Sequence, residues 1–405
     1  MKREVTWMLC LMATVAVFSL FVTGPAYSQD AAKGQATVAA AQKPAPVGSD
    51  LGLPGKLGKA ISKTTAGKGK GLIDTDAERG YLGIPGAPKV NLFIGFLWAI
   101  WVGWVFSTVG AFGGIMAGVG HITIFGLGAY AKTFKNSAPE LNKFITDSIR
   151  VSNSWLVGLS ALVSSYNYGK QKRLVTSLGI FLGLGALVAT FLVVFTTAGK
   201  IKFSQYQGFF GLIVFIIGGF MVYEMTPKGQ KSKQTAQAAA KAFEATVKNK
   251  GDIQEQGVKT LKWSLAETEI SFFGQTFRFS PIWAFIGGFV ISAVASFIGV
   301  GGGFLYVPFL TSVVGLPMFV VAGTSALSVL IGMIFGIFNF MVLAGVKVYW
   351  PMIGAELVGI FIGSMIGPRT GKYIPNKVLK LIFIVLALYV GLRYTLRGFF
   401  GIQLL

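Results

Sequence analysis

Long apolar runs succeed one another along most of this chain, and they restrict its fold more than any other feature. They cover residues 91–131, 147–168, 174–198 and 206–225, and then 281–315, 317–343, 350–367 and 377–398. A helix needs about 20 apolar residues to cross the hydrocarbon core of a membrane. Because 53% of all residues are hydrophobic and only 13% are charged, polar surface cannot cover such runs in water. The sequence therefore predicts an all-α integral membrane protein with about eight transmembrane helices.

The apolar runs form two sets of four that resemble each other. The first run of each set is too long for one simple crossing, and the second-half version, at 35 residues, is too short for two. Glycines interrupt both runs at the same place. Laying Ser107 on Ser296 aligns, without a gap, Gly110 with Gly299, Gly113 with Gly302 and Gly114 with Gly303. We expect two repeated four-helix halves with glycine-broken or re-entrant helices; chance clustering among 54 glycines is the alternative.

The N-terminus has the parts of a secretory signal peptide. Lys2 and Arg3 precede an apolar run that ends near Val22, and small residues follow up to Ser28. We expect residues 1–28 to be removed, and an uncleaved first membrane helix is the alternative. A signal peptide together with the apolar runs predicts a multi-pass protein of the bacterial cytoplasmic (inner) membrane.

Two polar segments flank the first half. Residues 29–90 are rich in Ala, Gly, Lys and Pro, so we expect a flexible extracytoplasmic segment. The first transmembrane repeat spans 91–225, and a polar inter-repeat segment, with a helix-prone piece near 234–247, spans 226–280. The second repeat spans 281–405. Four crossings per half would return 226–280 and the C-terminus to the side of residue 29.

The glycine interruptions mark the expected binding site. A backbone N–H without a partner costs several kcal/mol in hydrocarbon, so a broken helix persists only where protein or an aqueous cavity satisfies it. The N-terminus of a half-helix presents free N–H groups and partial positive charge, which suits an anion. We expect contacts to substrate from Gly110, Gly113, Gly114, Gly299, Gly301, Gly302 and Gly303. Close helix packing through small residues is the alternative.

Uncharged donors follow the glycines in each half. Thr324 and Ser325 open a long apolar run, and Asn153 and Ser154 correspond to them in the first half. Their amide and hydroxyl groups can replace part of an anion's hydration shell, or they can cap the helix.

Two ionisable side chains lie inside apolar runs. Glu356 is a candidate for proton coupling because burying a charge is expensive, although pairing with Lys347 is an alternative. His121 is the second candidate for proton coupling, because an imidazole side chain can exchange a proton, and a hydrogen-bonded packing role is its alternative. With one histidine and one cysteine in the chain, we expect no metal site and no cofactor.

The net charge of +21 belongs to segments that flank the apolar runs. Lys and Arg in such positions are typical of topology signals, and Arg369, Lys372, Lys377 and Lys380 are of this kind. No RNP-like, zinc-finger or helix-turn-helix pattern interrupts these segments, so we expect no nucleic-acid partner. The sequence assigns no oligomeric state.

The second half resembles a known family of transporters. It has Gly299-Val-Gly-Gly-Gly303 with Pro308, then Gly315-Leu-Pro317 and Ala322-Gly-Thr-Ser325, and it ends with Gly359, Gly363, Gly367, Ile374-Pro375, Leu379-Lys380 and Gly391-Leu-Arg393. This string is similar to the sulfite exporter TauE/SafE family. The resemblance implies duplicated four-helix units that transport sulfite, organosulfonates or related compounds without a cofactor. The first half departs from the pattern, because no proline follows Gly113-Gly114 and Ser152-Asn153-Ser154 replaces Gly-Thr-Ser.

These features together predict a membrane transporter of a small sulfur-containing anion, working by alternating access between the two halves. Its expected partners are the anion and the lipid bilayer. We expect no enzyme, because no convergent set of nucleophiles, metal ligands or paired carboxylates lies inside the runs. The alternative function is a membrane-embedded structural or assembly subunit acting through 29–90 and 226–280.

Overall fold

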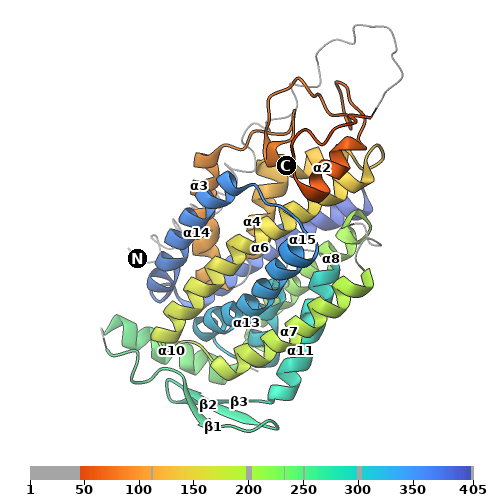
Figure 1. Ribbon diagram of the computed structural model, residues 1–405. Helices are drawn as coiled ribbons and strands as arrows, with labels where there is room; N and C mark the ends of the chain where they lie inside the picture. The colour runs from red at the N-terminus through yellow and green to blue at the C-terminus, as the bar shows by residue number, and fades with distance from the viewer. Residues whose placement is uncertain are drawn as a thin grey trace.

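The computed structural model describes residues 46–110, 113–197, 203–231, 233–249, 251–298 and 303–402. The expected signal peptide lies outside these residues, as do Gly299, Gly301 and Gly302. The described part is mostly helical: long helices form a bundle, a short N-terminal segment covers one end, and a small sheet with a helix covers the other (Figure 1).

The first half of the bundle begins with a well-capped helix. The side chain of Asn91 accepts hydrogen bonds from the N–H groups of Phe93 (3.0 Å) and Ile94 (3.1 Å), which satisfies the start of α3. The helices of this half are α3 (Leu92–Val109), α4 (Gly113–Val119), α5 (Leu127–Thr133), α6 (Pro139–Lys170), α7 (Thr176–Thr197) and α8 (Phe203–Met225). A π-helical turn, η3 (Gly120–Ile124), continues α4.

The second half repeats this order of elements. It contains α11 (Pro281–Ile298), α12 (Gly303–Pro308), the π-helical turn η4 (Phe309–Val313), α13 (Met318–Phe338) with the π-helical turn η5 (Asn339–Leu343), α14 (Trp350–Gly371) and α15 (Asn376–Phe399).

Glycine seams hold helices of the two halves together at backbone distance. α3 packs against α14, α7 against α11, and α8 against α15. A side chain at Gly359 or Gly363 of α14 would clash with the α3 carbonyls of Phe96 and Ile100. Close approach through small residues is the packing that a lipid environment favours, since no hydrophobic force drives helices together there.

Four helices of the described part are long and apolar enough to span a membrane. They are Leu92–Val109, Met318–Leu343, Trp350–Gly371 and Asn376–Phe399. The pair Gly113–Ile124 and Leu127–Thr133, bent by 59°, forms a fifth, broken candidate. Three apolar helices are shorter in their described parts: Thr176–Leu192, Gly211–Met225 and Pro281–Val294. The chain is therefore a multi-pass membrane protein, whereas the number of eight spans stays a prediction.

Residues 46–90, where the sequence predicts a flexible segment, instead fold against the bundle in the structure. They contain α2 (Gly55–Ser62) and the short 3-10 turn η2 (Tyr81–Gly83). Leu57, Ile61 and Tyr81 are fully or almost fully buried. The segment has few large apolar residues, but those few pack on the helices, and this contact replaces a core of its own.

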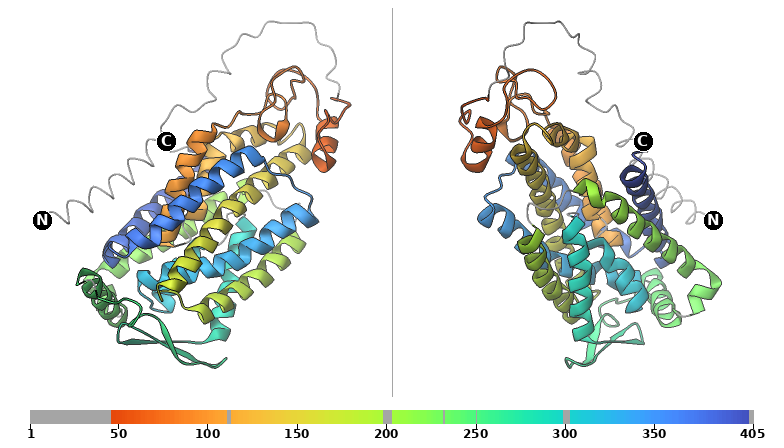
Figure 2. Two further views of the ribbon diagram at one scale, coloured as in Figure 1. Left: turned by 60° about the vertical axis from the view of Figure 1, so that its left-hand side comes forward. Right: turned by 90° about the vertical axis from the view of Figure 1, so that its right-hand side faces the viewer.

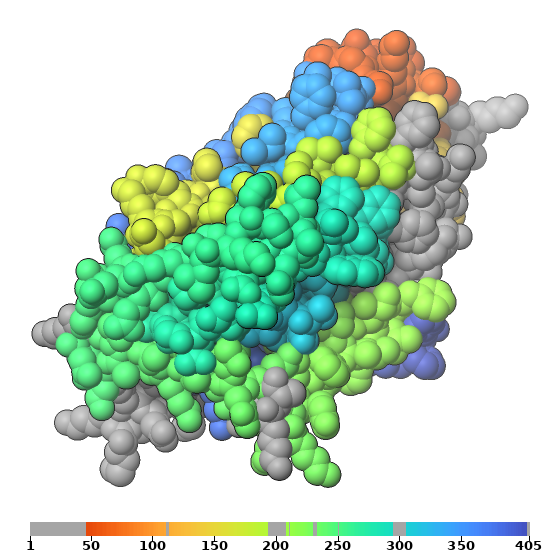
Figure 3. Space-filling view, turned by 90° about the horizontal axis from the view of Figure 1, so that it is seen from below, coloured from red at the N-terminus to blue at the C-terminus, as the bar shows by residue number. Residues whose placement is uncertain are grey.

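Residues 226–280 add a sheet to a chain expected to be all-α. α9 (Pro227–Lys231) and α10 (Gln234–Lys248) precede a three-stranded antiparallel sheet with the order β1-β2-β3. The strands are β1 (Lys259–Lys262), β2 (Thr268–Phe272) and β3 (Gln275–Phe279), and Thr268 of β2 pairs with Phe279 of β3. Alternate residues of β2 are buried, which is the pattern of a half-buried strand. Seen from below, this segment covers much of the lower face (Figure 3).

The two extramembrane segments lie at opposite ends of the bundle (Figures 1 and 2). Lys63 pairs with Glu140 at the start of α6 (3.0 Å), and Val258 N donates to Lys172 O just past its end (2.7 Å). The expectation that both segments share one side is therefore wrong. The expectation fails because the broken segment α4–α5 carries the chain back to the end of the bundle at which α3 begins. The first half therefore crosses the bundle one more time than expected.

Candidate functional site

The first glycine cluster interrupts the helix in which it lies. α3 ends at Val109, and Gly110 follows with φ +93° and ψ −169°, a conformation that is essentially restricted to glycine. α4 then begins at Gly113. In the second half, the described parts of α11 and α12 end at Ile298 and begin at Gly303, and the glycines between them lie outside the described residues.

The first break lies against helices of the second half. A Cβ atom on Gly110 would lie 2.8 Å from Val307 Cγ2 of α12 and 3.1 Å from Ser325 Oγ of α13. Two of the predicted binding residues, Gly110 and Ser325, are therefore neighbours although 215 positions separate them in the chain. We call this contact the Gly110–Ser325 junction.

The other glycines of the first cluster serve packing in different degrees. A side chain at Gly113 would clash with Phe106, so this position needs glycine for close approach to α3. At Gly114 a Cβ atom would meet Val157 at 3.4 Å, which is an ordinary contact.

Thr324 and Ser325 are fully buried. The hydroxyl of Thr324 accepts from Val175 N (3.1 Å) and donates to Val320 O (2.9 Å), and Ser325 Oγ donates to Ala322 O (3.2 Å). Because α13 begins at Met318, these residues do not cap their own helix. Thr324 instead satisfies a backbone N–H just before α7, which ties the α6–α7 turn to the second half.

Asn153 and Ser154 lie on α6. Ser154 Oγ donates to Arg150 O (3.0 Å), so its hydroxyl is used within the helix. Asn153 Oδ1 is buried without a hydrogen-bond partner in the described part of the chain. No contact that the described residues make joins this pair to the Gly110–Ser325 junction.

His121 and Glu356 form a buried pair. The Nε2 atom of His121 lies 3.1 Å and 3.0 Å from the two carboxyl oxygens of Glu356, and both side chains are fully buried. His121 belongs to η3 and Glu356 to α14, so the pair links the broken segment to a spanning helix. The alternative in which Glu356 pairs with Lys347 is wrong. Among the described residues, His121 Nδ1 has no hydrogen-bond partner.

Tyr81 of the N-terminal segment inserts its hydroxyl above this pair. It lies 2.9 Å from Ser148 Oγ, which donates to Lys347 O at 2.6 Å. Burial raises the pKa of Tyr81 to about 12, and the charge of Glu356 adds a smaller rise while the hydrogen bond to Ser148 opposes it. The phenol is therefore neutral at physiological pH, and it lies within electrostatic reach of Glu356.

A row of buried hydroxyls follows one face of α6 from this point. Ser148, Ser152, Ser160 and Ser164 are all fully buried and are separated by multiples of four positions. Ser160 Oγ lies 2.7 Å from Ser364 Oγ of α14, whereas Ser152 and Ser164 have no hydrogen-bond partner within the described ranges. The spacing alone signals this row, which sequence reasoning missed.

Arg173, also missed as a functional residue, is a buried cation in the α6–α7 turn. Its side chain is 1% exposed, and its Nε donates to Phe319 O (3.1 Å) and its Nη1 to Gln171 Oε1 (3.0 Å). The rings of Tyr168, Phe243 and Phe319 surround the guanidinium at 4.7, 5.0 and 5.6 Å.

No carboxylate of the described residues lies within 4.0 Å of Arg173. Burial lowers the pKa of Arg173, but a guanidinium stays charged in proteins. The backbone carbonyl oxygen of Arg173 would lie 2.7 Å from a Cβ atom placed on Gly323. The turn that carries this buried charge therefore contacts Gly323 and Thr324. Burying a cation without an acidic partner is costly, which makes Arg173 a candidate site residue.

The described residues include no group of three or more His, Cys, Asp or Glu side chains that could hold a metal ion.

The family model of the sulfite exporter TauE/SafE matches residues 94–394, from α3 to α15. The chain belongs to the sulfite exporter TauE/SafE family. The resemblance predicted from the second half is thereby confirmed, and it extends over the first half and over residues 226–280. The TauE/SafE family is a family of membrane transporters, so this chain is a transporter-family protein with the membrane bilayer as its surroundings. No curated protein and no solved structure matches the chain significantly.

Proposed function

We propose that this TauE/SafE protein exports a small sulfur-containing anion, such as sulfite or an organosulfonate, by alternating access. The observation that carries the proposal is the Gly110–Ser325 junction, where a break in one half meets a buried hydroxyl of the other. A substrate site between two halves lets each state of the transporter open it to one side of the membrane.

Inverted repeats are common in transporters that work by alternating access, and several observations support this layout here. Ser107 and Ser296 lie 189 positions apart, and the same shift carries Leu92–Val109 onto Pro281–Ile298 and Gly120–Ile124 onto Phe309–Val313. In this correspondence the α3–α14 contact is the counterpart of the α11–α7 contact. The candidate crossings are four long helices, one broken span and three shorter apolar helices, and α6 runs beside them from one end of the bundle to the other.

The positive charge of Arg173 gives the proposed site its preference for anions. The turn of Arg173 contacts Gly323 and Thr324, and the row of α6 hydroxyls leads away from it toward Tyr81. The aromatic rings and carbonyl oxygens around Arg173 compensate its positive charge only in part. The remaining charge would stabilise a bound anion. We assign Arg173, Gly110, Thr324 and Ser325 to the substrate path, and we retain Gly114, Asn153, Ser154 and the second glycine cluster, including Gly303, as proposed members.

The orientation we propose has residues 46–90 outside the cell and residues 226–280 in the cytoplasm. A signal peptide, as the sequence predicts, would leave the residues after it on the extracytoplasmic side, and residues 226–280 lie at the opposite end of the bundle. An inside-negative potential then drives an anion outward by about 2.3 kcal/mol per charge and 100 mV. Export therefore needs no further energy source.

The His121–Glu356 pair is our candidate for proton exchange during transport. Replacing Glu356 by Gln keeps a hydrogen-bonding side chain of the same size beside His121 and removes the exchangeable acid. We expect Glu356→Gln to fold and to abolish the response of flux to a transmembrane pH gradient. Flux that responds to the gradient as in the wild type would remove Glu356 from the proposal.

The function is tested by measuring flux of labelled sulfite, sulfate, thiosulfate and a short sulfonate from liposomes containing the purified protein. We expect saturable flux of at least one reduced sulfur anion, and a loss of about tenfold in Ser325→Ala, the effect of about 1.4 kcal/mol at the site. Thr395→Ala is the matched control. The hydroxyl of Thr395 also donates to a carbonyl of its own helix, Gly391 O, at 2.7 Å. Equal loss in both variants, or no flux of any of these anions, would refute the proposal.

A further inference from the structure

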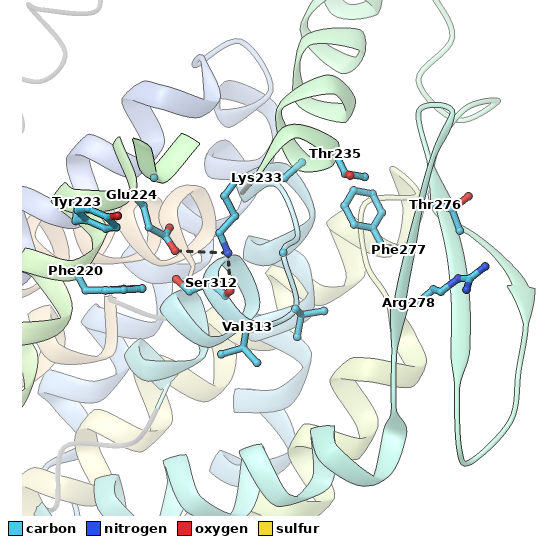
Figure 4. A pocket seen from close by; sticks show the side chains of 14 residues that line it. Phe220, Tyr223, Glu224, Lys233, Thr235, Thr276, Phe277, Arg278, Ser312 and Val313 are labelled. Carbon is cyan, nitrogen blue, oxygen red and sulfur yellow. Dashed lines mark hydrogen bonds and ion pairs between the residues drawn. The ribbon is translucent and has the colours of Figure 1, made fainter. Parts of the chain in front are cut away.

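A cavity of about 580 Å³ lies where the membrane helices meet the segment 226–280, away from the Gly110–Ser325 junction. Its wall comes from five elements: the end of α8, α9, the start of α10 with Lys233 before it, strand β3, and η4 with the residues after it. Figure 4 shows Lys233 at its centre, Phe220 and Tyr223 on one side, and Thr276 and Arg278 on the other. The cavity thus has apolar lining from Phe220, Tyr223 and Val313, and a polar side formed by Glu224, Lys233 and the sheet residues Thr276 and Arg278.

The apolar side continues along α8. Phe209, Ile213, Ile216 and Phe220 recur at helical spacing, and their side chains are 57%, 38%, 60% and 51% exposed. In a membrane protein such a stripe faces lipid chains. Phe220 both ends this stripe and lines the cavity, so one molecule can lie along the stripe and reach inside.

The polar side carries a small excess of positive charge. Glu224 is almost fully buried, with Lys233 Nζ at 3.6 Å and Lys380 Nζ at 3.7 Å from its two oxygens, so two cations face one anion. Arg278 pairs with Glu269 at 2.8 Å, which adds no net charge. The sum of one positive charge complements a phosphodiester, which carries one negative charge.

We infer that this cavity binds the headgroup of an anionic phospholipid, with an acyl chain lying along the α8 stripe. Its phosphodiester faces Lys233 and Arg278, and Thr235 and Thr276 supply hydroxyl donors. Lys233 also donates to the carbonyls of Thr311 (3.1 Å) and Ser312 (2.5 Å), at the end of the broken segment of the second half. The bound lipid therefore joins residues 226–280 to η4.

The test is native mass spectrometry of the purified full chain with phosphatidylglycerol and, separately, with phosphatidylcholine. We expect phosphatidylglycerol to be retained preferentially, and Arg278→Gln to weaken its binding about fivefold, the effect of one cationic side chain near an anionic lipid. Glu269→Gln should strengthen it, because it removes the acid that neutralises Arg278. Lys262→Gln, an exposed change on β1 outside the cavity, is the matched control.

The contact of the acyl chain with α8 is tested with Phe220→Ser. This change should weaken the binding of phosphatidylglycerol while leaving Glu224 and its two lysines unchanged. Inorganic phosphate and glycerol 3-phosphate are the probes without acyl chains, and we expect neither to compete with phosphatidylglycerol. Arg278 is 65% exposed, so its substitution does not compromise folding. Equal retention of both lipids, equal effects of Arg278→Gln and Lys262→Gln, or competition by inorganic phosphate would each overturn the inference.

Discussion

Gly110 occupies a backbone conformation that other residues adopt only at a cost. Its φ of +93° with ψ of −169° costs a residue with a side chain about 1–3 kcal/mol. Its neighbours, Val307 and Ser325, leave a Cβ atom little room. Strain and crowding therefore coincide at the junction between the two halves.

Gly110→Ala should destabilise the protein by at least about 1–3 kcal/mol and reduce anion flux. Gly118→Ala is its control, because Gly118 lies in α4 and a Cβ atom there would meet nothing within 4 Å. Alanine favours a helix over glycine by about 1 kcal/mol, so Gly118→Ala should be neutral or stabilising. Thermal unfolding in detergent measures both, and equal destabilisation by the two changes would contradict this reading of Gly110.

Arg173 is the residue at which charge and packing can be separated. Methionine has a similar length, and replacing a buried charge by an apolar side chain of similar volume is often neutral for stability. We expect the free energy of unfolding of Arg173→Met to lie within about 2 kcal/mol of the wild-type value. We also expect its flux to fall about tenfold or more, as loss of a charged hydrogen bond predicts. Arg369→Met, at an exposed cation near the end of α14, should do neither. Unchanged flux in a folded Arg173→Met would assign Arg173 to packing alone.

At the scale of elements, the N-terminal segment depends on the protonation of Tyr81. Its pKa in the folded state, about 12, exceeds the ordinary value of 10.0, so the folded protein holds this proton more tightly. The stabilisation is complete below pH 10 and is lost as the pH rises toward 12. We expect the wild type to lose more stability than Tyr81→Phe over this interval. Parallel loss in unfolding curves of the two proteins would show that Tyr81 does not anchor the segment.

Local patterns in the sequence predict the helices well. The Ser107–Ser296 alignment predicts two breaks, and at the first of them the structure ends α3 at Val109, next to Gly110. The length of an apolar run and the position of a glycine are properties of neighbouring residues. They can therefore be recognised without knowledge of the tertiary structure. The helix-prone piece near 234–247 likewise becomes α10.

The rest depended on contacts between distant residues. His121 and Glu356 are 235 positions apart, and no local pattern pairs them. Residues 46–90 look flexible because their stability comes from α6 rather than from their own core. The sheet of 226–280 was missed since its strands are short and only β2 alternates throughout. Arg173 lies between two apolar runs, where a cation is typical of a topology signal, and only the tertiary fold places Phe243 and Phe319 around it.

At the scale of the whole molecule, folded segments close both ends of a bundle whose halves meet at the Gly110–Ser325 junction. Tyr81 enters from one end, and Phe243 covers Arg173 at the other. In the proposed mechanism, the junction opens in turn toward each end. Helices packed through glycine seams can slide or rock with small backbone changes, which suits such motion.

Accessibility of position 325 tests most directly whether an anion passes this junction. The chain has a single cysteine, Cys10, so Ser325→Cys together with Cys10→Ser leaves one reporter. Ser325 is fully buried in the closed arrangement, and a small charged thiosulfonate reagent can reach it only when the junction opens. We predict that the Ser325→Cys variant is labelled in liposomes. We also predict that a short, unreactive sulfonate slows this labelling. A cysteine that is never labelled, or is labelled at a rate no anion changes, would contradict a substrate path between the halves.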